Sequence, residues 1–272
     1  MKKILITISI VFGLNSYSQV FKAQNLQITG GSPGLNKVLT SDNYGNVSWQ
    51  SLGSLGLIQI QAPFVTSGTG QIWMDRNLGA TRVATSMNDY LAFGDLYQWG
   101  RGSDGHQTIT YSSSTSVSSS SPVDTNLSGS DNPGSSFISN TSGLNSYDWR
   151  NPSNITLWQG VNGKNNPCPT GFKVPTLINF NKEINYYGLI IIGTDTASKA
   201  YGNTPMKFVS HILRNGKLTG APFDPSYGCL WTSTLDTNGN AFAFSIGGGQ
   251  STTYSYEHVF GFNVRCIYES GN

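Results

Sequence analysis

The chain has 272 residues, enough for one large domain or for a small module followed by a domain. Charged residues make up only 11% of it, against about 25% in typical globular proteins, and Ser, Thr, Asn and Gly take their place. This composition suits loop-rich β structure or an extracellular surface, and a formal charge of only +2 argues against a nucleic-acid-binding protein.

Residues 1–18 have the pattern of a secretory signal peptide. Two lysines precede the apolar run ILITISIVFGL, which has the length of a signal-peptide core and is too short to span a bilayer. Ser16 and Ser18 then provide the small residues of a cleavage site. We therefore expect an exported protein, periplasmic or at the cell surface, that begins at Gln19 and does not insert into a membrane. The alternative is a buried N-terminal strand or helix.

Residues 19–57 differ from the rest of the chain. The runs KVLTSD and NVSWQ flank a turn-rich centre and predict a β-hairpin. Because one hairpin buries too little surface to be stable alone, we expect residues 19–62 to form a small β stalk module and linker. The segment resembles short modules of tail-fibre-like and surface proteins of Bacteroidetes and their phages. That resemblance implies a stalk or a homotrimer contact through residues 19–57.

The main domain is expected over residues 63–272. Strands are predicted at residues 71–75 and 95–100. Residues 103–165 form a polar insertion that contains the run SSSTSVSSSSP, interpreted as a flexible surface loop; the alternative is a ligand-contacting loop. Trp149 and Trp158 near its end are expected to be buried and to tie the insertion to the core.

The segment NPCPTGFKVPT, residues 166–176, holds a cysteine between two prolines and leads into a predicted helix. Thr176 is a suitable N-cap, and Gly188 can end the helix. The apolar face repeats at helical spacing through Leu177, Phe180, Ile184 and Tyr187. Because Asn179 stands where an acidic residue is usual, no full capping box is expected.

The last third of the chain has the alternating pattern of β structure. CLWTSTL and AFAFSI flank DTNGN, whose Asn-Gly pair favours a tight hairpin turn. The final strand is predicted over residues 260–268, with Phe262, Val264 and Cys266 on one face.

Five motifs occur in a characteristic order: WMDRNLGA, FGDLYQWGR, NPCPTGFKVPT, LWTST and GFNVRC. Together they resemble the Fibrobacter succinogenes major paralogous domain family, within the wider group that has a C-type-lectin-like fold. The resemblance covers about residues 71–268. It implies an α+β, C-type-lectin-like domain with a long polar loop insertion, behind the small β-hairpin stalk.

The resemblance also implies a disulfide between Cys168 and Cys266, which would close a loop of roughly 100 residues. The alternative is two buried free thiols. Cys229, the remaining cysteine, is interpreted as a buried unpaired thiol.

No catalytic constellation is visible in the sequence. His106, His211 and His258 lack the spacing of a zinc site, and there is no nucleophile elbow or phosphate-binding glycine loop. Asp75, Asp89 and Asp95 flank strands and turns, where capping is the favoured role. We therefore predict no catalytic residue, no metal and no cofactor.

A binding surface is the remaining hypothesis. The calcium-coordinating triplets of sugar-binding C-type lectins are absent, and DTNGN lacks the residues of a calcium loop, so no calcium-dependent sugar site is expected. The stretch before the last strand is rich in Tyr, Ser, Thr and Gly, which recognition loops favour. The candidate ligand-binding residues are Thr252, Thr253, Tyr254, Tyr256 and His258; the alternative is an ordinary polar hairpin.

The sequence thus predicts a non-enzymatic exported recognition protein that binds a surface glycan or protein through the face before the last strand. The first alternative is a structural fibre or matrix component, and the second is an enzyme of unknown type.

Overall fold

The computed structural model describes residues 37–51, 62–189, 196–210, 213–218, 222–223, 227–247 and 252–269. The predicted signal peptide, most of the linker to the main domain, His211 and the glycine-rich stretch 248–251 lie outside these residues. The chain divides into two units, Met1–Gln59 and Ile60–Asn272.

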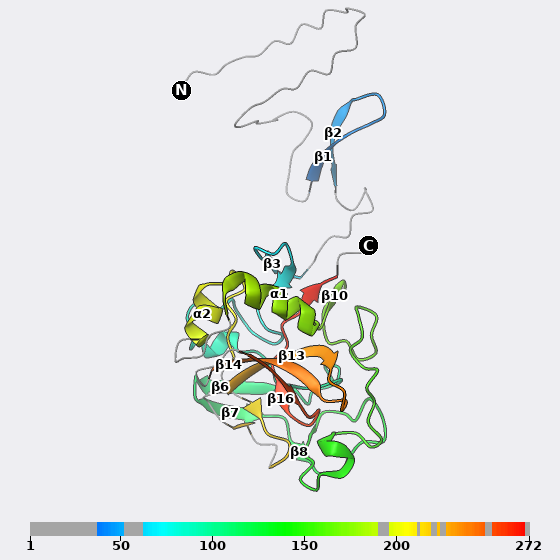
Figure 1. Cartoon of the computed structure of the whole chain (residues 1–272), viewed down its shortest axis with the longest axis vertical. Coiled ribbons are helices and arrows are strands. Elements are labelled where there is room, and N and C mark those ends of the chain that lie inside the picture. The colour runs from blue at the N-terminus through cyan, green and yellow to red at the C-terminus, as the bar shows by residue number, and fades with distance from the viewer. Residues whose placement is uncertain are drawn as a thin grey trace, which may run out of the picture. The chain divides into compact units, whose positions relative to one another are not determined.

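Short strands dominate the part of the chain that the structure describes (Figure 1). The strands are β1 (Lys37–Ser41), β2 (Val47–Ser51), β3 (Phe64–Thr66), β4 (Ile72–Met74), β5 (Tyr97–Gln98), β6 (Ile109–Ser113), β7 (Ser116–Ser120), β8 (Val123–Asp124), β9 (Phe137–Ile138), β10 (Phe172–Lys173), β11 (Leu213–Arg214), β12 (Pro222–Phe223), β13 (Tyr227–Leu235), β14 (Ala241–Gly247), β15 (Thr252–Tyr256), β16 (Gly261–Phe262) and β17 (Ile267–Tyr268). The helices are α1 (Leu177–Tyr187), α2 (Thr196–Gly202) and the 3-10 turns η1 (Tyr90–Ala92) and η2 (Leu144–Tyr147).

The prediction of an α+β, C-type-lectin-like domain is wrong. Helix makes up only 12% of the structure, with α1 as its one substantial helix, and the strands form several small sheets. The larger sheets have the orders β10-β17-β4-β3, β12-β11-β16-β5 and β13-β14-β15. The physical reason lies in the apolar pattern, which repeats at helical spacing over Leu177–Tyr187 but alternates with period two through the last third of the chain.

The first unit contains the predicted hairpin. Strands β1 and β2 pair antiparallel with Leu39 opposite Trp49, as the runs KVLTSD and NVSWQ predict. The Asp42 carboxylate closes the turn by accepting hydrogen bonds from the backbone N–H groups of Tyr44 and Asn46, both at 2.9 Å.

In the second unit, the sheet β13-β14-β15 separates two apolar cores. Alternation along β13 sends Cys229 and Trp231 to one face and Leu230 to the other, where Leu230 pairs with Phe244 of β14. Helices α1 and α2 lie on one side of β13 and β14 (Figure 1), and both contribute side chains to the core that contains Leu230. We call the two cores the tryptophan core and the helix-side core.

The buried members of the tryptophan core are Met74, Leu78, Tyr97, Trp99, Ile138, Trp149, Leu157, Trp158, Phe172, Val174, Cys229, Trp231, Ala241, Ala243, Phe262, Val264 and Cys266. The buried members of the helix-side core are Trp73, Phe180, Ile184, Leu189, Ala200, Met206, Phe208, Leu230, Phe244, Ile246 and Ile267.

Helix α1 begins and ends where the sequence predicts. The Thr176 side chain accepts a hydrogen bond from the Asn179 N–H, and Gly188 ends the helix with a left-handed φ of 62°. The expectation of an incomplete capping box is wrong, because the Asn179 amide oxygen accepts a hydrogen bond from the Thr176 N–H at 2.9 Å. An asparagine thus performs the role that a glutamate usually has there.

The Glu183 carboxylate joins α1 to the β3–β4 hairpin. Glu183 is fully buried, and its Oε1 accepts four side-chain hydrogen bonds, from Ser67 Oγ at 2.8 Å, Thr69 Oγ1 at 2.8 Å, Gln71 Nε2 at 2.6 Å and Trp73 Nε1 at 3.0 Å. Burial of a carboxylate is tolerated when hydrogen bonds replace its water. One side chain therefore fixes the position of the helix against the sheet β10-β17-β4-β3.

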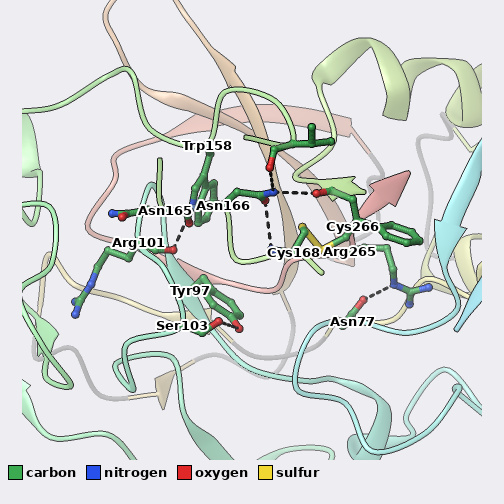
Figure 2. The surroundings of a disulfide bond; sticks show 12 residues. Asn77, Tyr97, Arg101, Ser103, Trp158, Asn165, Asn166, Cys168, Arg265 and Cys266 are labelled. Atoms are coloured by element: carbon green, nitrogen blue, oxygen red, sulfur yellow. Dashed lines mark hydrogen bonds between the residues drawn. A yellow bond between two sulfur atoms is a disulfide. The ribbon is translucent and has the colours of Figure 1, made fainter. Parts of the chain in front are cut away.

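The predicted disulfide between Cys168 and Cys266 is confirmed, with Cα atoms 5.9 Å apart and a sequence separation of 98. Asn166 orders the loop before Cys168, donating to the carbonyls of Val161 at 3.0 Å and Phe172 at 2.8 Å (Figure 2). The disulfide therefore anchors a turn of the chain to the segment that leads into β17. Cys229 is a buried free thiol as predicted, and burial raises its pKa to about 12.

The polar insertion is more regular than predicted. The Ser-rich run, expected as a surface loop, contributes β7 to the antiparallel hairpin β6–β7, and β8 pairs parallel with β9. Trp149 and Trp158 are buried as predicted. The Trp149 indole N–H donates to the Trp99 carbonyl at 2.7 Å, and that of Trp158 donates to Arg101 at 3.1 Å. These bonds tie the end of the insertion to the core.

The C-terminal segment is broken where one continuous strand is predicted. Only β16 and β17 are regular, and they belong to different sheets. Phe262, Val264 and Cys266 nevertheless all enter the tryptophan core, so the predicted alternation is correct. No helix among the described residues is long and apolar enough to cross a membrane.

Asp95 lies just before β5 and gives the domain a pH-dependent stability. Burial raises the pKa of Asp95 to about 6, against 3.8 in the unfolded chain, although the Ile109 N–H opposes this shift. A carboxyl whose pKa is raised by folding contributes stability that is fully present below pH 3.8 and is lost as the pH rises through about 6.

Replacing Asp95 with asparagine should therefore stabilise the protein at neutral pH and above. We expect a gain of about 2 kcal/mol in the free energy of unfolding at pH 8, and little difference near pH 3.5. Urea unfolding of both proteins across this pH range measures the effect. An equal difference at both ends of the range would show that Asp95 does not titrate as described.

Candidate ligand-binding site

Strand β15 carries four of the five predicted ligand-binding residues, and they differ in exposure. Tyr254 is 46% exposed, and Thr253 is half-buried. Tyr256 is half-buried against the tryptophan core, with its ring 4.9 Å from that of Phe262. The backbone of Thr252 pairs with Ser245, and its side chain lies outside the described part of the structure. Among the predicted side chains that the structure describes, Tyr254 is thus the most exposed, whereas Tyr256 has a packing role.

His258, the fifth predicted residue, is buried just beyond the end of β15. Its imidazole is 5% exposed and stacks on Trp99, with ring centroids 4.2 Å apart and planes inclined by 22°. Its Nδ1 lies 3.1 Å from Oδ2 of Asp148, 110 residues away in sequence. The Nε2 atom is buried and has no hydrogen-bond partner within the described ranges. Such a nitrogen is uncommon, because buried polar atoms are usually paired.

The His258 ring forms part of the wall of a cavity of about 230 Å³. Three separate segments meet there: the end of the polar insertion, the turn between β13 and β14, and His258, which lies shortly after the end of β15. The lining residues are Asn145, Ser146, Asp148, Ser153, Ile155, Asn238, Gly239, Asn240 and His258. We call this the His258 cavity.

The insertion reaches the His258 cavity through an unusual backbone. Asn145, Ser146 and Tyr147 have φ values of 50°, 53° and 59°, a left-handed conformation that non-glycine residues seldom adopt. Side chains hold it in place: Asn140 donates to the carbonyls of Leu144 at 2.6 Å and Asp148 at 2.9 Å. Such strained stretches concentrate at functional sites.

The opposite wall is the turn that the DTNGN motif predicts. Asp236 Oδ1 accepts hydrogen bonds from the backbone of Asn238 at 2.8 Å and of Asn240 at 2.9 Å, and Gly239 has a φ of 84°. These bonds hold the turn with Asn238 and Asn240 in the cavity wall. The prediction of a hairpin turn is confirmed, but the position of this turn beside His258 was not predicted.

The contact with Asp148 fixes the orientation of the His258 ring, because Oδ2 of Asp148 lies within hydrogen-bond distance of Nδ1. The remaining polar walls are amides and hydroxyls, which both donate and accept. Among the described residues, no group of three or more His, Cys, Asp or Glu side chains is arranged to hold a metal ion.

No protein-family model, curated protein or solved structure matches this chain. The resemblance to the Fibrobacter succinogenes major paralogous domain family therefore stays a proposal that depends on the five sequence motifs. The fold that it implied is the one corrected above.

Sequence reasoning identified His258 but missed its surroundings. Asp148 and Asn145 lie in the segment NSYDW, which was interpreted only as the end of a polar insertion. The available signal was Gly143 with small polar residues on both sides, Ser139–Ser142 before it and Asn145 and Ser146 after Leu144, a composition typical of turns with left-handed backbone. That signal predicts a turn, but not which part of the chain the turn faces.

Proposed function

We propose that this chain is an exported, non-enzymatic recognition protein that binds a surface glycan or protein through β15 and the residues that follow it. The observation that carries the proposal is the His258 cavity, whose walls are mainly amide and hydroxyl side chains. Concave sites with a few convergent polar groups are the usual form of ligand-binding sites.

Strand β15 extends this polar surface away from the cavity. Tyr254 exposes its ring on the same strand that leads to His258, and its ring lies 6.5 Å from that of Tyr256. Tyrosine gives a rigid contact area that is both apolar and hydrogen-bonding, which recognition surfaces favour. A ligand that occupies the cavity and extends along β15 would contact both.

The disulfide supports export. Disulfides persist in oxidising compartments and are rare in the cytosol. Together with the signal-peptide pattern of residues 1–18, this favours a periplasmic or cell-surface location. The low charge of the chain is the basis for proposing no nucleic-acid partner.

A structural fibre or matrix component is the second candidate, favoured by the hairpin β1–β2. Its Tyr44 is 91% exposed and its Val47 is 63% exposed. A two-stranded hairpin with exposed apolar residues is suited to association with copies of itself. This supports the proposed homotrimer contact through residues 19–57, which is compatible with either function.

A glycan array with purified Gln19–Asn272, run with and without a calcium chelator, tests the proposed function. We expect hits that resist the chelator and weaken about 10-fold in Tyr254→Ala, which removes an exposed aromatic contact. Tyr186→Ala is the matched control, because Tyr186 is 62% exposed on α1. Hits abolished by the chelator would contradict a calcium-independent site. A blank array would reject glycan binding and favour a protein ligand or the structural alternative.

A further inference from the structure

Strand β15 forms an edge of the sheet β13-β14-β15, and among the described residues no strand pairs with its outer side. We propose that this edge pairs with β15 of a second copy of the chain, antiparallel and across a two-fold axis at Tyr254. The contact would join the three-stranded sheets of the two molecules into one continuous sheet. This inference concerns the backbone of β15, goes beyond the proposed ligand binding and does not depend on it.

The hydrogen bonds of β13 establish which backbone groups of β14 face β15. The N–H of Trp231 donates to the Asn263 carbonyl at 3.0 Å, and the Asn263 N–H donates to the Cys229 carbonyl at 3.1 Å. The backbone groups of Cys229 and Trp231 therefore point away from β14. Because these groups alternate in direction along a strand, those of Leu230 point toward β14, where Leu230 pairs with Phe244.

The same alternation continues across β14 to β15. Since the N–H and C=O of Phe244 point toward β13, those of Ala243 point toward β15, where Ala243 pairs with Tyr254. The backbone groups of Thr253 and Ser255 then point away from β14. In agreement, neither residue makes a backbone hydrogen bond outside the pairing of β14 with β15 among the described residues. The outer edge therefore offers the N–H and the C=O of both residues, and Ser255 is exposed.

The edge of β15 has none of the features that usually protect an edge strand from pairing. Its sequence TTYSY has no charged residue and no proline. Its register with β14 is unbroken from Thr252 to Tyr256, so no bulge bends the strand away. The other outer strand, β13, is covered: Asn263 binds its backbone, and the Ser233 N–H donates to the Pro175 carbonyl at 2.8 Å. An open, uncharged edge is suited to the addition of another strand.

The positions of the outward groups favour a second copy as the added strand. When two β15 strands run antiparallel with Tyr254 opposite its own copy, each Thr253 lies opposite Ser255 of the other molecule. Both members of such a pair have outward N–H and C=O groups, so every outward group of the two strands forms a hydrogen bond. A symmetric contact also brings like residues close together, and the absence of charge on β15 removes the repulsion that would oppose it.

Tyr254 lies at the centre of this pairing. Its side chain is 46% exposed. Residues opposite each other in a non-hydrogen-bonded pair have Cα atoms about 4.5 Å apart, so the two Tyr254 rings would pack together. A strand of five residues buries far less surface than the roughly 800 Å² per partner of a standard interface, so we expect a Kd on the order of 100 μM.

Sedimentation equilibrium of Gln19–Asn272 from about 10 μM to 1 mM tests the association. The decisive variant is Ser255→Pro, because proline removes the outward N–H of residue 255 but leaves the bonds of Tyr254 and Tyr256 to β14. We expect it to associate at least 10-fold more weakly than the wild type. Ser255→Ala is the matched control, since it retains the backbone N–H and should associate normally. Association through residues 19–57 would be common to all three proteins. Equal association of the wild type and Ser255→Pro would overturn the proposal.

Cysteine cross-linking tests the register and keeps the proposal testable if Ser255→Pro fails to fold. The two Cα atoms of residue 254, about 4.5 Å apart, lie within the range that a disulfide spans, whereas those of residue 255 would be roughly 8–9 Å apart. Mild oxidation should therefore convert Tyr254→Cys into a covalent dimer at least 10-fold faster than Ser255→Cys. Equal rates, or no dimer of Tyr254→Cys, would overturn the two-fold pairing. A protein that stays unassociated but binds a synthetic Thr-Val repeat peptide, and loses this binding in Ser255→Pro, would assign the edge to a foreign strand and overturn the second copy.

Discussion

Replacing Cys168 and Cys266 together with alanine is expected to lower the free energy of unfolding by about 4 kcal/mol. The two cysteines are 98 residues apart, so the cross-link removes many conformations from the unfolded chain. For a domain of this size, such a loss lowers Tm by roughly 10 °C. Thermal unfolding followed by circular dichroism measures it directly.

A reductant provides the matched control for this prediction. It should lower the Tm of the wild-type protein and of Cys229→Ala by similar amounts, because Cys229 is a buried free thiol. It should have no effect on the double variant. If the double variant unfolds at the same temperature as the wild type, the cross-link adds no stability and the account of this region is wrong.

Replacing Glu183 with methionine is expected to cost about 4 kcal/mol, because four side-chain donors would lose their common acceptor in the protein interior. Two of these donors are Gln71 Nε2, which lies just before β4, and Trp73 Nε1, which lies in β4. Their distances to Glu183 Oε1 are 2.6 and 3.0 Å. Methionine preserves the approximate volume, so the loss reports on hydrogen bonding more than on packing. Urea unfolding measures the difference.

Glu183→Gln is the control for this second experiment. Glutamine retains one carbonyl oxygen that can accept the same four hydrogen bonds, and its amide group would occupy the place of Oε2, which has no partner in the described structure. We expect the glutamine variant to lose at most half as much stability as the methionine variant. Equal losses would indicate that the negative charge of Glu183, rather than its geometry as an acceptor, stabilises the domain.

Features encoded by neighbouring residues were predicted well from the sequence. Thr176 and Gly188 set the bounds of α1 because capping depends on a few adjacent groups. The turn at Asp236 is also local, because the Asp236 carboxylate accepts hydrogen bonds from the backbone N–H groups of Asn238 and Asn240. The hairpin β1–β2 has the same local origin.

The fold class failed because it depends on how distant segments assemble. The motifs predicted the disulfide correctly through a family resemblance, whereas the α+β architecture drawn from that resemblance is not present. Even the capping box shows the limit of residue statistics, since Asn179 fulfils a role that the pattern reserved for an acidic residue.

The candidate site was predictable only in part for the same reason. His258 stood out in the sequence as a polar residue before the last strand, but its burial is created by Trp99 and its orientation by Asp148. Neither partner is near it in the chain, and no local pattern links them. The cavity wall also includes the turn at Asn238. Neighbouring residues set the shape of this turn, but they do not indicate which distant segment it faces.

Histidine-selective nitrogen NMR shows whether ligand binding occurs at the cavity beside His258. The chain has three histidines, and His106 is an internal reference because its Nε2 already accepts a hydrogen bond from the Gln98 N–H at 2.9 Å. Burial lowers the pKa of His106 to about 4, so its ring stays neutral near pH 7. On titration with a glycan that binds, we expect the His258 ring resonances to shift, because this residue lines the cavity, and those of His106 to stay unchanged. Binding that leaves the His258 resonances unmoved would show that the ligand lies elsewhere.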